Sequence, residues 1–204
     1  MGVYKLSTAG GLTTPRTNYS SFLAGNPAVR FTSYESIATV TVGSGGTSTI
    51  SFTSIPATYT HLQLRMLGKT SSSDNGSGIS LSINSSSFSY YHRLASFRGG
   101  SGYDSQGSAV SLIGYFPCTA SGVDNMFGGM VLDILDYTNT NKNKTTRCLW
   151  GYSNNGVAAG SEFQGLHSGL WNDTSAITSL SLTAESSRTF SQYSHFALYG
   201  IKGA

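Results

Sequence analysis

The sequence predicts an all-β protein: an antiparallel, jelly-roll-like β-sandwich with an extended N-terminal arm. Three observations favour this class. Charged residues make up 10% of the 204 residues, against about a quarter in an ordinary soluble domain. Aromatic residues reach 12% and glycine occupies 25 positions. Short stretches of alternating apolar and polar residues recur along the chain, which is the pattern of half-buried strands.

Residues 1–33 are predicted to form the extended arm, and residues 34–204 the single β-sandwich domain. Glycine, proline and asparagine interrupt the arm, and no regular period persists in it. Such a segment buries too little of itself to fold alone, so we expect it to lie on its own domain or on a neighbouring subunit. A loose tail is the alternative. The candidate docking residues of the arm are Tyr4, Leu6, Pro15, Arg16, Tyr19, Phe22 and Leu23.

In the first half of the domain, alternation predicts a β-hairpin. Residues 36–42 and 47–55 each alternate, and the turn sequence Gly43-Ser44-Gly45-Gly46 lies between them. Residues 61–67 form the clearest half-buried strand, with Leu62, Leu64 and Met66 on one face. Further strands are predicted at residues 79–83, 90–97 and 110–116, and the last is apolar on both faces, as a central strand would be.

In the second half, residues 127–137 are predicted to pair with residues 146–152 around a polar loop at 139–145. Strands at 161–170, 176–183 and 193–201 complete the pattern. We expect roughly eight to eleven strands and no helix, and antiparallel strands in that number close into two packed sheets.

Charge and composition exclude several classes of protein. The net charge of +3 is small, and its tightest basic group, Lys142, Lys144 and Arg147, lies in a predicted loop without interleaved aromatic residues. Nucleic-acid binding is therefore not expected. No apolar run approaches the roughly 18 residues of a membrane helix, and no signal peptide is recognisable, so we expect neither membrane insertion nor export by a cleaved signal. Cys118 and Cys148 are interpreted as buried thiols, with a disulfide as the alternative.

The titratable residues show no catalytic or metal-binding pattern. Asp133 and Asp136 are three residues apart in an apolar strand, so they face opposite sides of the sheet and cannot flank one glycosidic bond. We expect them to accept hydrogen bonds or to pair with an arginine, and only a cleft shared with Asp173 would favour an enzyme. The histidines lack metal-ligand spacing, so the sequence predicts no catalytic residue, no metal and no cofactor. The four histidines are His61, His92, His167 and His195.

Some aromatic side chains lie in predicted loops or at strand ends and could stack on sugar rings. These candidates for glycan contact are Tyr90, Tyr91, Tyr103 and Trp171. Packing in the core or at a sheet edge is the favoured alternative.

Several stretches resemble structural proteins of marine and cyanobacterial tailed phages. Near the beginning these are residues 4–7, 14–17 and 21–27, and within the domain Ser54-Ile55-Pro56-Ala57-Thr58-Tyr59-Thr60-His61-Leu62-Gln63-Leu64-Arg65 resembles a strand of the form IP-x-x-Y-x-H-L. Residues 132–137, 168–172 and 196–202 show the same resemblance, which spans nearly the whole chain.

The resemblance implies a non-enzymatic component of the virion, made in the host cytoplasm. It implies a tail-fibre or adaptor protein, or a capsid decoration protein, whose arm docks onto the particle while the β-domain forms a homo-oligomer, with a trimer favoured. The expected partners are other virion proteins and copies of the same chain. A carbohydrate-binding module that contacts a host surface glycan is the alternative from a different functional class.

Overall fold

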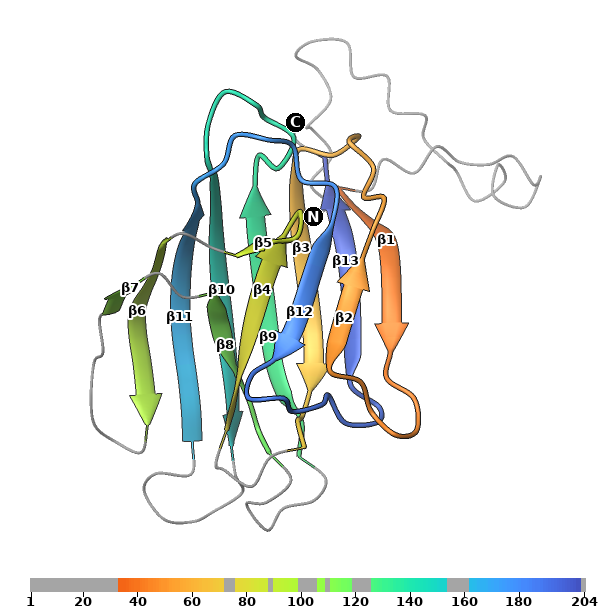
Figure 1. Cartoon of the computed structure of the whole chain (residues 1–204), viewed down its shortest axis with the longest axis vertical. Coiled ribbons are helices and arrows are strands. Elements are labelled where there is room, and N and C mark those ends of the chain that lie inside the picture. Colours follow the sequence, from red (N-terminus) through yellow and green to blue (C-terminus); the bar gives the residue numbers. More distant parts are fainter. Residues whose placement is uncertain are drawn as a thin grey trace, which may run out of the picture. The chain divides into compact units, whose positions relative to one another are not determined.

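The computed structural model describes residues 33–71, 76–87, 90–98, 106–108, 111–118, 126–153 and 162–202. Within these ranges the chain forms thirteen strands and no helix, and hence no helix able to cross a membrane. The strands make two antiparallel sheets, one of eight strands and one of five (Figure 1). The predicted all-β class and the two-sheet arrangement are therefore confirmed.

The eight-stranded sheet has the order β1-β13-β3-β9-β10-β11-β6-β7. Its strands are β1 (Tyr34–Thr41), β13 (His195–Ile201), β3 (His61–Gly68), β9 (Gly128–Leu135), β10 (Lys144–Ser153), β11 (Glu162–Trp171), β6 (Tyr90–Arg98) and β7 (Gln106–Ser108). The predicted pairing around the polar loop is confirmed, because β9 and β10 are neighbours in register.

The five-stranded sheet has the order β2-β12-β4-β5, and β8 also pairs with β4. Its strands are β2 (Thr49–Phe52), β12 (Leu180–Ala184), β4 (Ser77–Ile83), β5 (Ser86–Ser87) and β8 (Leu112–Phe116). The chain passes from one sheet to the other repeatedly: β1 and β3 lie in the larger sheet, and β2 and β4 in the smaller one (Figure 1).

The hairpin predicted across Gly43–Gly46 is wrong. Strand β1 pairs with β13, and β2 pairs with β12 in the other sheet. Gly45 and Gly46 adopt positive φ angles of 89° and 71°, which let the connection cross between the sheets. Alternation shows only that each strand has one buried face, and two strands on opposite sides of a core satisfy it as well as two paired strands do.

The strand predicted at 176–183 begins later than expected, at Leu180. The Asn84 side chain accepts hydrogen bonds from the backbone N–H groups of Thr178 and Ser179 and donates one to the carbonyl of Ala176. One amide side chain thus satisfies backbone groups that a neighbouring strand would otherwise satisfy, and this segment stays irregular.

The core lies between the sheets. On β3, Leu62, Leu64 and Met66 are buried while the residues between them point outwards. Apolar residues of β4 and β12, such as Leu81 and Leu182, are buried on the facing sheet. Each such side chain contributes about 1.5 to 3 kcal/mol relative to an exposed one. The two sheets are therefore held together mainly by apolar burial.

Lys144, expected in a polar loop, is instead the first residue of β10 and is 0% exposed. Its Nζ donates hydrogen bonds to the carbonyl oxygens of Asn139, Lys142 and Thr174. Burial lowers the pKa of Lys144 because the charged form is desolvated, while nearby Asp173 raises it. The ammonium group therefore ties the β9–β10 loop to the segment that follows β11.

Replacing Lys144 by methionine should lower the free energy of unfolding by about 2 to 4 kcal/mol, because three carbonyl groups lose their donor. The exposed Lys142 gives a matched control, and Lys142→Met should cost less than about 1 kcal/mol. Urea denaturation of both variants checks this, and equal losses would contradict the role assigned to Lys144.

Gly200 should not tolerate a side chain. A Cβ placed there would lie 2.2 Å from Cγ of Tyr59, whose ring packs against the core. Gly200→Ala should therefore cost about 2 to 3 kcal/mol of stability through overpacking. At Gly43 nothing lies within 4 Å of the corresponding position, so Gly43→Ala should change stability by less than about 0.5 kcal/mol. Thermal denaturation compares the two.

Candidate functional site

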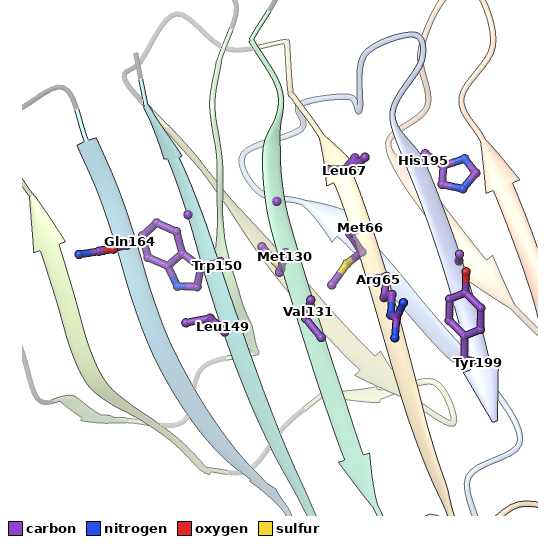
Figure 2. A pocket seen from close by; sticks show the side chains of 13 residues that line it. Arg65, Met66, Leu67, Met130, Val131, Leu149, Trp150, Gln164, His195 and Tyr199 are labelled. Carbon is purple, nitrogen blue, oxygen red and sulfur yellow. The ribbon is translucent and has the colours of Figure 1, made fainter. Parts of the chain in front are cut away.

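A hollow lies on the outer face of the eight-stranded sheet, the face turned away from the core. It encloses about 580 Å³ and crosses five neighbouring strands, from β13 to β11 (Figure 2). We call its centre the trough and define it by Leu67, Gly129, Val131, Leu149 and Gly151. No carboxylate lines this hollow.

Two glycines form the floor of the trough. Gly129 and Gly151 are direct partners in the β9–β10 register, and Leu67 is the partner of Gly129 on β3. A Cβ at Gly129 would meet nothing within 4 Å, and one at Gly151 would first meet the carbonyl oxygen of Phe163 at 3.4 Å. The hollow thus exists because two adjacent outward positions lack side chains, not because the backbone bends away.

Apolar side chains surround these glycines and are open to solvent. Leu67 is 56% exposed and Leu149 is 61% exposed, and Val131 lies beside Leu149 in register. Figure 2 shows these side chains on three neighbouring strands. Scattered apolar residues are normal on a protein surface, but a contiguous group on one sheet face indicates a contact surface.

A polar network borders the trough. The Nε of Arg65 donates to Oε1 of Gln63 at 2.8 Å, and Nε2 of Gln63 donates to Oδ1 of Asp133 at 2.8 Å. The guanidinium of Arg65 also lies 5.5 Å from the ring centre of Tyr34 and 5.1 Å from that of Tyr199. Cation–π contacts of this kind contribute about 0.5 to 1 kcal/mol each at exposed sites. They hold the arginine in one orientation.

The three aspartates considered as catalytic candidates each have a local structural partner. Asp133 accepts a hydrogen bond from Arg147 at 3.4 Å, Asp136 accepts one from Lys142, and Asp173 accepts one from the backbone N–H of Ser175 at 2.7 Å. This is the arginine or loop-amide pairing that the sequence indicated for Asp133. Among the described residues, no three His, Cys, Asp or Glu side chains come together as a metal site would require.

Cys118 and Cys148 are both buried and are not joined in a disulfide, so the prediction of buried thiols is confirmed. Burial raises the pKa of Cys148 well above its ordinary value, with a further contribution from the negative charge of Asp133. Thiols of low pKa are the reactive ones, so Cys148 has a packing role.

For Trp171, the structure agrees with the favoured alternative of packing in the core and speaks against contact with a glycan. Its side chain is 2% exposed, and its Nε1 donates a hydrogen bond to Oγ of Ser86 at 3.0 Å. Buried at the end of β11, the indole offers no face to a sugar. Tyr90 and Tyr91 begin β6, but their side chains lie outside the described part, as does Tyr103. The arm residues Tyr4, Leu6, Pro15, Arg16, Tyr19, Phe22 and Leu23 also lie outside it.

Sequence reasoning did not identify the trough, although one signal was present. Residues 130–135 are apolar at odd and even positions alike, interrupted only by Asp133. A strand with one solvated face should be polar at every second position, so Val131 and Leu135 break the pattern. The register that places Leu67 and Gly151 next to them is not visible in the sequence.

No protein-family model matches this chain, and no curated protein matches its sequence significantly.

The carboxylate of Asp136 should make the stability of the fold depend on pH in the acid range. The hydrogen bond from Lys142 lowers the pKa of Asp136 below its ordinary value of 3.8. Its stabilisation is therefore present above pH 3.8 and is lost as the pH falls through the lower folded-state value. The residue has a φ of 49°, which asparagine tolerates. Asp136→Asn should reduce the acid-induced fall in melting temperature between pH 5 and pH 2. Equal slopes for wild type and variant would contradict the assignment.

Proposed function

We propose that this chain is a non-enzymatic structural protein of a tailed-phage virion, most consistent with a tail-fibre or adaptor component, with capsid decoration as the alternative location. The observation that carries the proposal is the exposed apolar trough on the eight-stranded sheet. Two leucines that are more than half exposed, Leu67 and Leu149, lie on either side of β9 with Val131 between them, and such a group favours a protein whose surface is covered in an assembly.

The strand order supports the finer description of the fold as a jelly roll. The sequence β1-β13-β3-β9 in one sheet faces β2-β12-β4-β8 in the other, so strands near the start of the domain pair with strands near its end. Strands β10, β11, β6 and β7 extend the first sheet beyond β9. Double-sheet jelly rolls occur in viral capsid proteins and in lectins, and this support is an analogy of fold.

The arm at 1–33 is proposed to dock onto other virion proteins, and the β-sandwich at 34–204 to associate with its own copies. Low charge suits both contacts, because only 10% of the residues carry a charge whose desolvation would oppose association. Host attachment through a glycan remains the second candidate from the sequence, but the burial of Trp171 removes one of its four aromatic contacts.

Incorporation into particles tests this function. Tagged full-length protein, supplied during growth of the phage that encodes it, should co-purify with intact particles. A variant lacking residues 2–28 should fold, as judged by circular dichroism, yet be reduced at least tenfold in purified particles because its docking segment is missing. Immunoblotting of gradient-purified particles measures both.

A matched pair of variants separates the effect of a charge in the trough from the effect of a charge elsewhere on the surface. Leu149→Glu places a charge in the trough, whereas Thr183→Glu places it at an exposed position on β12 of the smaller sheet. Only the former should reduce incorporation. Full-length protein that never co-purifies with particles would refute the proposed function.

A further inference from the structure

We propose that the trough is covered by the same trough of a second copy of this chain, related by a two-fold axis that runs approximately along β9. This inference rests on the proposed role as an assembling subunit and names the partner of that surface. In a two-fold interface the same patch serves both copies, so each protrusion must meet a hollow of the same patch. The trough has this property.

Shape complementarity follows from the register. Leu67, Gly129 and Gly151 lie side by side on β3, β9 and β10. A two-fold axis along β9, in the plane between two facing sheets, exchanges the positions of β3 and β10. It therefore sets the protruding Leu67 of each copy against the hollow at Gly151 of the other, while Gly129 faces its own equivalent. The strands of Leu67 and Gly151 are two strand spacings, about 10 Å, apart. The two symmetry-related contacts between Leu67 and Gly151 therefore lie on either side of the axis and form at the same time.

The neighbouring row of side chains matches under the same axis. Ala197, Arg65, Val131 and Leu149 succeed one another across β13, β3, β9 and β10. The axis sets Val131 against its own equivalent, and Leu149 against the apolar stem of Arg65. The stem of Arg65 is held in place by the contacts of its guanidinium with Tyr34 and Tyr199, so it offers an ordered surface.

In the row that contains Asp133, the charges of the two copies sum to zero. Asp133 lies on β9 with Gln63 and Arg147 as its register partners on either side. Pairing brings two Asp133 carboxylates together, which repel one another, and this repulsion is offset by the Arg147 guanidinium beside each carboxylate. The same pairing sets each Arg147 against Gln63 of the other copy. Two carboxylates and two guanidiniums sum to zero in this row, and each carboxylate keeps the hydrogen bonds from its own Gln63 and Arg147.

The face is of the size that a pair needs. Five strands spaced at about 4.8 Å, each contributing roughly seven residues, cover on the order of 600 Å² in projection. A standard specific interface buries about 800 Å² of accessible surface on each partner, and side-chain relief makes accessible area larger than projected area. A partner of acidic character is the competing occupant, since the rows described above hold two arginines, Arg65 and Arg147, and one carboxylate, Asp133.

The test exchanges protrusion and hollow in the full-length protein and measures self-association by sedimentation equilibrium. Leu67→Ala removes the protrusion, and Gly151→Leu fills the hollow; each should weaken the dimer by about tenfold or more. The combination of both substitutions restores a protrusion facing a hollow, so it should recover most of the affinity. A Cβ at Gly151 makes its first contact at 3.4 Å, an ordinary van der Waals distance, so a side chain can start there without overlap. Circular dichroism confirms that each variant folds.

Thr183→Glu on the smaller sheet is the control and should leave the dimer unchanged. A double variant that self-associates more weakly than either single variant would overturn the two-fold pairing. So would a wild-type protein that forms a trimer, or one that is monomeric after 100-fold dilution from about 1 mM. A monomer that binds an acidic virion protein through the trough would assign the face to that partner instead. A wild-type protein that does not self-associate but enters particles normally refutes this inference alone, whereas a stable wild-type dimer that is absent from particles refutes the proposed function alone.

Discussion

Burial of one face of every central strand is the constraint on which the structure depends. Side chains alternate along a strand, so the apolar set Leu62, Leu64 and Met66 can be buried only if a second sheet covers it. Strands β4 and β12 supply that cover with their own alternating apolar residues. Lys144 is also buried, and its ammonium group donates hydrogen bonds to three backbone carbonyl oxygens instead of reaching solvent.

The same alternation along the strands gives the larger sheet an outer face, but the second sheet does not cover this face. Residues that must point away from the core are normally polar, yet Leu67, Val131 and Leu149 are apolar and Gly129 and Gly151 lack side chains. Leu67 and Leu149 remain more than half exposed in the monomer. The proposed pairing of two copies would cover these residues, and the hydrogen-bonded network of Arg65, Gln63 and Asp133 lies beside them.

The elements themselves were largely predictable, and their partners were not. Strands β3, β9, β10 and β13 fall close to the predicted ranges because each shows a two-residue period. Local patterns, however, do not record which strand lies beside which, and the supposed hairpin of residues 36–55 proved to be two strands in different sheets. The late start of β12 depended on the side chain of Asn84, distant in sequence by about a hundred residues.

By itself, the sequence determined the all-β class, the approximate strand positions and the expectation of a surface poor in charge, because composition and alternation are local properties. Only the tertiary structure decided that Trp171 is buried, that Asp133 pairs with Arg147, and that Leu67, Gly129 and Gly151 lie in one row. These facts depend on the register between strands that are far apart in the chain. Register is fixed by the packing of all inward side chains at once, which no short stretch of sequence contains.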